Sequence, residues 1–181
     1  AGLSLMTEAL QREDWILVAA AARTALEMAG PGVTRALMSV VADLPEPNQI
    51  LVIETLGLRG DPLALGILKP LAQQGNAPVR IVAIEAMAQI ADPRAAKVLA
   101  DLLADSDRAV AQAAKVSLGS LPGSDVDGLV VALIESRDSR KQSLGIELAG
   151  HRRLTSAIPV LLVAATGPDA RVRSAALAMV G

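Results

Sequence analysis

The chain has 181 residues, 52% of them hydrophobic, which is enough to bury a sizeable core in one or two domains. Its 17 basic and 19 acidic side chains give a net charge of −2, so the composition favours neither nucleic-acid binding nor attachment to a membrane surface. One His and no Cys exclude disulfides, zinc thiolates, cysteine nucleophiles and His-rich metal sites, and with one Trp and no Phe or Tyr the core must be aliphatic.

Residue types recur along the chain at a fixed spacing of 31 residues, starting with Pro31, Pro62 and Pro93. We call the residues at one position of this repeat a column. An apolar column holds Met6, Leu37, Leu68, Leu99, Val130 and Leu161; a mostly small one holds Leu26, Gly57, Ala88, Gly119, Gly150 and Gly181; and a mostly acidic one holds Asp14, Pro45, Asn76, Asp107, Asp138 and Asp169. The repeat units are therefore expected at about 1–29, 30–60, 61–91, 92–122, 123–153 and 154–181.

Each unit is expected to contain two helices, as the unit 92–122 illustrates. A first helix is predicted from Pro93 to Leu103, because proline is favourable in a first turn and apolar residues then recur every three or four positions. Asp107 is expected to cap a second helix, which ends near Pro122. No segment alternates between apolar and polar residues as a half-buried strand would.

A hairpin of two short helices cannot bury its own apolar face, so the units must stack on one another. The small column suits this arrangement, since Gly and Ala let neighbouring helices approach closely. We therefore predict an all-α fold, an α-α superhelix of about six two-helix repeats with a 31-residue period, forming one domain over residues 1–181.

Residues 77–95 include Val79-Arg80 and end in a D-P-R-A turn, and residues 169–176 read D-A-R-V-R-S-A-A. Both segments resemble HEAT-like repeats of the short kind named after phycobilisome lyases, whose pattern is D-x-x-V-R-x-x-A followed by a D-P-R-A turn. The resemblance implies a convex layer of Pro-started helices and a concave layer of Val-Arg helices. It also implies a ladder between successive repeats that uses Asp107, Asp138, Asp169, Arg80 and Arg173, and that fails at Val18, Gln49, Ala111, Gln142 and Pro45.

The expected partner-binding surface lies on the second helices. Glu54, Glu85 and Glu147 share a column that the helical period leaves exposed. Ile50 and Ile81 lie beside it, and they are either exposed as a contact site or covered where neighbouring helices close over them. The predicted binding residues are Ile50, Leu51, Glu54, Ile81, Val82 and Glu85 at the centre, extended by Gln112, Arg140, Glu147 and His151.

No catalytic, cofactor-binding or metal-binding residues are predicted. His151 is expected to end a helix, where a cation interacts favourably with the helix dipole. Gly30-Pro31-Gly32 is expected to be a turn, because it lacks the Gly-Lys-Ser that completes a phosphate loop. Trp15 is expected to cover the N-terminal end of the stack, or else to contact a partner.

These observations predict a non-catalytic scaffold that binds protein partners through a concave surface, without cofactor, nucleic acid or membrane. Two alternatives remain: a bilin-lyase-like subunit that handles a chromophore, which the family resemblance suggests, and a structural or regulatory spacer of a larger protein. Because the last helix is apolar on several sides, we expect further domains in the same chain or an end-to-end contact. The lack of Cys, signal sequence and membrane segment favours the cytoplasm.

Overall fold

The computed structural model describes residues 2–180, and all regular secondary structure in that range is helical. This confirms the all-α repeat fold that the 31-residue period predicts. Gly181, the last member of the small column, lies outside the described residues. The chain divides into two compact units, residues 1–117 and residues 118–181.

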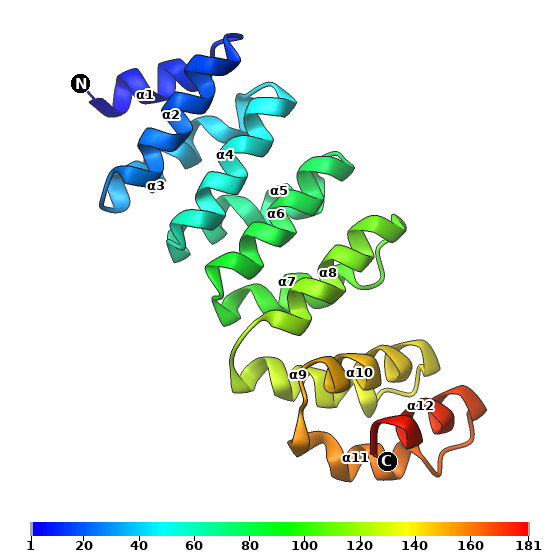
Figure 1. Ribbon diagram of the computed structural model, residues 1–181. Helices are drawn as coiled ribbons and strands as arrows, with labels where there is room; N and C mark the ends of the chain where they lie inside the picture. Colours follow the sequence, from blue (N-terminus) through cyan, green and yellow to red (C-terminus); the bar gives the residue numbers. More distant parts are fainter. Residues whose placement is uncertain (1, 181) are drawn as a thin grey trace. The chain divides into compact units, whose positions relative to one another are not determined.

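Within the described residues, the N-terminal unit contains four helix pairs, and the second helix of each pair is the longer one. The pairs are α1 (Gly2–Leu10) with α2 (Trp15–Glu27), α3 (Pro31–Val40) with α4 (Glu46–Arg59), α5 (Leu65–Gln74) with α6 (Ala77–Ile90), and α7 (Ala96–Leu102) with α8 (Arg108–Ser120), whose last turn belongs to the C-terminal unit. Short 3-10 turns lie at Val41–Asp43, Pro62–Ala64 and Pro93–Ala95. The second helices pack side by side, α2 on α4 and α4 on α6, and so form one layer (Figure 1).

The C-terminal unit repeats this organisation. Its helices are α9 (Ser124–Ile134), α10 (Ser139–His151), α11 (Ile158–Ala164) and α12 (Ala170–Val180), with a 3-10 turn at Thr155–Ala157 before α11 (Figure 1). The second helix α10 packs against both α9 and α12. Each unit is therefore a short stack of helix pairs.

The aliphatic core follows the columns of the repeat. All six members of the apolar column are buried, with 5% or less of their surface exposed: Met6, Leu37, Leu68, Leu99, Val130 and Leu161. These residues come from the first helix of each pair and pack beneath the second. Burying a Leu or Val side chain contributes about 1.5–3 kcal/mol, so this column is a major stabilising element of each unit.

The acidic column caps the second helices, as predicted for Asp107. Its carboxylate accepts hydrogen bonds from the backbone N–H groups of Ala109 and Val110, at 2.8 and 3.4 Å. The same kind of cap is formed by Asp14, Asn76, Asp138 and Asp169. Pro45 has no acceptor side chain, and α4 begins without a side-chain cap.

The first helices that follow Asp-Pro begin differently from the prediction. The expected helix from Pro93 to Leu103 instead starts as a 3-10 turn, and α7 itself runs from Ala96 to Leu102. The cause is local: the Asp92 carboxylate accepts from the N–H of Arg94 at 2.8 Å and its carbonyl from the N–H of Ala95 at 3.0 Å. These tighter bonds close a 3-10 turn before the helix starts.

The Arg column of the expected ladder fastens three second helices to the ends of their own first helices. Three of its side chains donate to a backbone carbonyl eight residues earlier: Gln49 to Val41 at 3.0 Å, Arg80 to Ala72 at 2.9 Å, and Gln142 to Ile134 at 3.1 Å. A glutamine amide donates the same kind of hydrogen bond as a guanidinium, but these bonds lie within one repeat, so they do not replace the ladder between repeats that is expected to fail at Gln49 and Gln142.

The ion pair of the ladder joins other residues than expected. Arg80 pairs with Asp105, and the two side chains are 16% and 13% exposed. Asp107, the expected partner, caps α8 instead, and its own N–H donates to Asp105 at 2.9 Å. Arg173 donates to the carbonyls of Gly167 and Pro168, at 2.9 and 2.7 Å.

Two arginines outside the expected ladder, Arg59 and Arg152, fasten successive repeats together. Arg59 donates to the carbonyls of Ala25 and Met28, which lie 34 and 31 residues earlier. Arg152 donates to the carbonyls of Leu118 and Leu121 with the same two offsets. Each guanidinium thus satisfies carbonyl groups at the C-terminal end of the preceding second helix, which have no partner within that helix.

Trp15 lies directly after the capping Asp14, in the first turn of α2. Its surface is 52% exposed, and the neighbouring Ile16 is 81% exposed. That Trp15 covers the N-terminal end of the stack, or else contacts a partner, stays a prediction.

Candidate functional site

The predicted binding residues of the N-terminal unit lie on the exposed side of the second-helix layer. Ile50 and Leu51 of α4 are half-buried, and Glu54 is exposed one turn later. On α6 the same pattern recurs, with Ile81 and Val82 half-buried and Glu85 exposed. We call these six residues the acidic–aliphatic strip. The isoleucines are thus neither freely exposed nor covered: each is partly shielded by its neighbours.

The repeat register aligns the two halves of this strip. Because α4 and α6 pack side by side and their residues correspond at a spacing of 31, Glu54 and Glu85 occupy equivalent places on adjacent helices. Axes of packed helices lie about 8–10 Å apart. That spacing suits two separate contacts along an extended partner better than two carboxylates acting on one reacting atom.

A hollow of about 360 Å³ opens between α6 and α8, and we call it the α6–α8 hollow. It is lined by Ile81, Glu85, Ala109, Gln112, Ala113, Val116 and Ser117. The hollow therefore brings together three of the predicted residues, Ile81, Glu85 and Gln112.

The small side chains of α8 create this space. Ala113 stands in the column that holds Leu51 on α4 and Val82 on α6, and Ala109 stands where α6 has Pro78. The sequence analysis missed both alanines, although a drop in side-chain size along a column is a readable signal. The result is a mostly apolar recess with one carboxylate and one amide at its border.

The carboxylates of the strip are available to a ligand. Among residues 2–180, neither the carboxylate of Glu54 nor that of Glu85 forms a hydrogen bond or an ion pair, and both residues are exposed. An uncompensated carboxylate beside an aliphatic recess attracts a side chain that combines an apolar stem with a positive charge. The geometry therefore fits a basic, partly aliphatic segment.

The other three predicted residues, Arg140, Glu147 and His151, lie on α10 in the C-terminal unit and are exposed. His151 is the last residue of α10, as expected. Its ring covers Gly119, since a Cβ atom added at Gly119 would be 3.1 Å from the Nδ1 atom of His151. The histidine therefore has a packing role at the end of the helix.

No helix within residues 2–180 combines the length and the apolar character that crossing a bilayer requires. Residues 34–119 match the model of a family described as HEAT repeats. No curated protein sequence matches the chain.

Several solved structures share the fold. The chain is similar to one in the complex of CpcE and CpcF of phycocyanin lyase from Nostoc sp., with 20% identity, a TM-score of 0.58, and coverage of 98% of this chain and 75% of that one. Human deoxyhypusine hydroxylase is 14% identical with a TM-score of 0.56, over 98% of this chain and 95% of that one. A designed armadillo repeat protein in complex with the peptide (KR)4 is 16% identical with a TM-score of 0.52, and both chains are covered completely. At these identities the likeness is one of fold.

Proposed function

We propose that this chain, in which residues 34–119 match a HEAT-repeat model and whose fold resembles that of armadillo repeat proteins, is a non-catalytic scaffold that binds an extended segment of a partner protein. The partner would lie across α4, α6 and α8. The observation that carries the proposal is the α6–α8 hollow, which joins an aliphatic recess to the free carboxylate of Glu85.

The chemistry of the strip defines the partner. An aliphatic side chain would enter the α6–α8 hollow against Ile81 and Ala113, and basic side chains would meet Glu54 and Glu85. Since the chain has few aromatic anchors, which dominate many tight interfaces, the binding energy would be spread over several repeats. The designed armadillo protein solved with the peptide (KR)4 supports this idea, because a related fold there binds a basic peptide.

The test compares partners captured by the intact chain with those captured by variants, using quantitative mass spectrometry of affinity-purified complexes. Glu54→Lys combined with Glu85→Lys should lower the recovery of the bound partner at least tenfold, because like charges then face its basic residues. The matched control is Glu8→Lys combined with Asp101→Lys, which reverses two exposed carboxylates of α1 and α7 and should leave recovery unchanged.

A second pair of variants tests the recess. Ala113→Leu should fill the α6–α8 hollow and weaken binding while the helical content stays constant. Ile50→Glu with Ile81→Glu should remove the aliphatic contact. Retention of every partner by both the charge-reversed and the filled variants would refute the proposed surface.

The bilin-handling alternative is tested separately. A chromophore bound by the chain would change its visible absorption spectrum, so mixing the purified protein with a free bilin decides this point. We expect no spectral change, because the similarity to the phycocyanin lyase complex is one of fold and the chain has no cysteine to hold a bilin covalently.

A further inference from the structure

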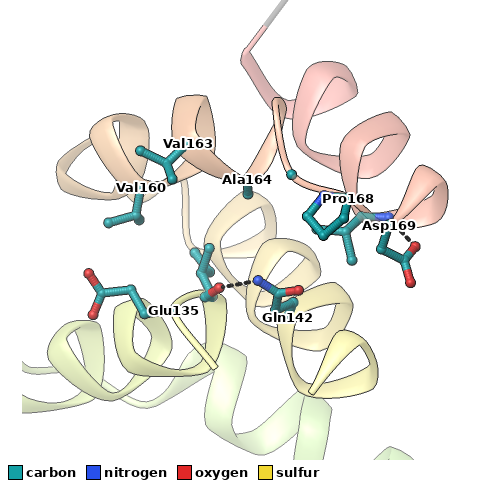
Figure 2. A pocket seen from close by; sticks show the side chains of 10 residues that line it. Glu135, Gln142, Val160, Val163, Ala164, Pro168 and Asp169 are labelled. Atoms are coloured by element: carbon teal, nitrogen blue, oxygen red, sulfur yellow. Dashed lines mark hydrogen bonds between the residues drawn. The ribbon is translucent and has the colours of Figure 1, made fainter. Parts of the chain in front are cut away.

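The C-terminal unit contains a second hollow, of about 410 Å³, which we call the Gln142 hollow. Figure 2 shows it between Glu135 at the end of α9, Gln142 on α10, Val160 and Val163 on α11, and the loop at Pro168 and Asp169 that leads into α12. It lies outside the acidic–aliphatic strip, so it does not depend on the function proposed above.

The hollow exists because an ion pair of the N-terminal unit has no counterpart here. Two repeats, or 62 residues, separate Gln142 from Arg80 and Gly167 from Asp105. In the N-terminal unit Arg80 and Asp105 pair and occupy the space between the repeats. In the C-terminal unit the shorter Gln142 is held by the carbonyl of Ile134 at 3.1 Å, and the glycine has no side chain.

A third substitution enlarges the space. Ala164 stands where the N-terminal unit has the buried Leu102. Val163, on the neighbouring position of α11, is 72% exposed and forms part of the wall. The hollow is thus apolar along α11, where the stem of a long side chain would lie.

The charges around the Gln142 hollow are negative. Its ionisable lining residues within the described chain are Glu135 and Asp169. The Asp169 carboxylate accepts a hydrogen bond from the Ser139 side chain and others from the backbone of α12, and these bonds hold the pKa of Asp169 below its usual value. Glu135 is exposed, and its carboxylate forms no hydrogen bond or ion pair among residues 2–180. The nearby Arg173 is not part of the lining, and its guanidinium donates to the carbonyls of Gly167 and Pro168.

We propose that the Gln142 hollow binds an arginine side chain presented by a partner protein. The aliphatic stem would cover Val160 and Val163, and the guanidinium would pair with Glu135. The partner's arginine would thus take the place that the chain's own Arg80 side chain takes in the N-terminal unit. An arginine suits the site better than a lysine, because its planar group forms two parallel hydrogen bonds to one carboxylate.

The binding is tested by NMR titration of the full ¹⁵N-labelled chain with the peptide acetyl-Gly-Arg-Gly-amide. The expected result is a saturable shift of the backbone amides of Glu135 and Gly167 and of the Gln142 side-chain amide. The control peptide replaces arginine with citrulline, which has the same shape without the charge, and it should bind at least tenfold more weakly. A titration that leaves these amides unmoved, or equal binding of the two peptides, overturns the proposal.

Two variants locate the binding in the hollow. Glu135→Gln should weaken the arginine peptide at least tenfold, whereas Asp125→Asn, an exposed acidic residue at the other end of α9, should not. Gln142→Arg combined with Gly167→Asp should restore the internal ion pair and abolish binding. If this double variant does not fold, as judged by circular dichroism, the result with Glu135→Gln decides alone, and unchanged affinity there rejects the site.

Discussion

Gly57 of α4 faces Ala86 of α6 so closely that a Cβ atom added to the glycine would lie 2.9 Å from the Cα of the alanine. The two residues belong to successive repeats, 29 positions apart. The contact involves backbone, which cannot turn aside as a flexible side chain can. The absence of a side chain at Gly57 therefore sets the separation of the two helices in this part of the layer.

Replacing Gly57 with alanine is expected to destabilise the protein by about 1–3 kcal/mol, because an extra methyl group must push α4 and α6 apart. Urea denaturation followed by circular dichroism measures this loss. The result would contradict the close packing of these helices if the denaturation midpoint of Gly57→Ala matched that of the unmodified chain.

The matched control is Gly128→Ala on α9, where an added Cβ would meet nothing within 4 Å. Here the substitution should stabilise the protein by about 0.5–1 kcal/mol, because alanine loses less backbone entropy than glycine on forming a helix. The same chemical change is thus expected to have opposite signs at the two positions.

Ala91 ends α6 in the left-handed conformation, with φ +57°, at the position where Gly60 ends α4 with φ +64°. A residue with a Cβ atom is strained there by about 1–2 kcal/mol. Because glycine loses about 0.5–1 kcal/mol more backbone entropy on folding, we expect Ala91→Gly to stabilise the protein by about 0.5–1 kcal/mol. Thermal unfolding of Ala91→Gly and of the reverse change, Gly60→Ala, should show shifts of opposite sign.

The fold was predictable because its determinants recur. A single Leu99 predicts little, but six aliphatic residues at a spacing of 31 predict a buried column, and all six are buried. The caps were predictable for a similar reason, since Asp107 needs only the N–H groups two and three residues further along the chain. The geometry of a local hydrogen bond or of a repeated pattern can therefore be predicted from the spacing of residues in the sequence.

Contacts between repeats were harder to predict. The choice of Asp105 over Asp107 as the partner of Arg80 depends on how far a long side chain reaches across the space between helices. The same holds for Arg152, whose backbone carbonyl acceptors lie 31 to 34 residues earlier. The two hollows arise where a small residue, such as Ala113 or Gly167, replaces a larger side chain. Such a loss of side-chain volume is visible in the sequence only when residues of one column are compared.

Arg152 is held by five hydrogen bonds, three of which reach the preceding repeat. Its Nε and Nη2 atoms donate to Asp127 at 2.9 and 2.6 Å, while Nη1 donates to the carbonyls of Leu118, Gly119 and Leu121. A lysine ammonium has three donors and no planar fork, so it cannot form all five of these hydrogen bonds. We expect Arg152→Lys to lower the free energy of unfolding by about 2–3 kcal/mol, measured by urea denaturation.

The adjacent Arg153 provides the control for Arg152. It is exposed, so Arg153→Lys should change the stability by no more than about 0.5 kcal/mol. Equal effects of the two substitutions would mean that the bonds of Arg152 add nothing beyond those of a surface arginine.

The ion pair between Arg80 and Asp105 should make stability depend on pH. The hydrogen bond from the Arg80 side chain, aided by the N–H of Asp107, lowers the pKa of Asp105 from its usual 3.8. A lowered carboxyl pKa stabilises the folded state above the unfolded pKa, and this contribution is lost as the pH falls through the folded one. Asp105→Asn should therefore cost about 1–3 kcal/mol at pH 7, with a gap to the unmodified chain that stays constant down to about pH 5 and narrows below pH 4. Urea denaturation at both ends of this range checks the prediction, and a gap that remained equally wide at pH 3 would show that Asp105 contributes through its shape and not through its charge.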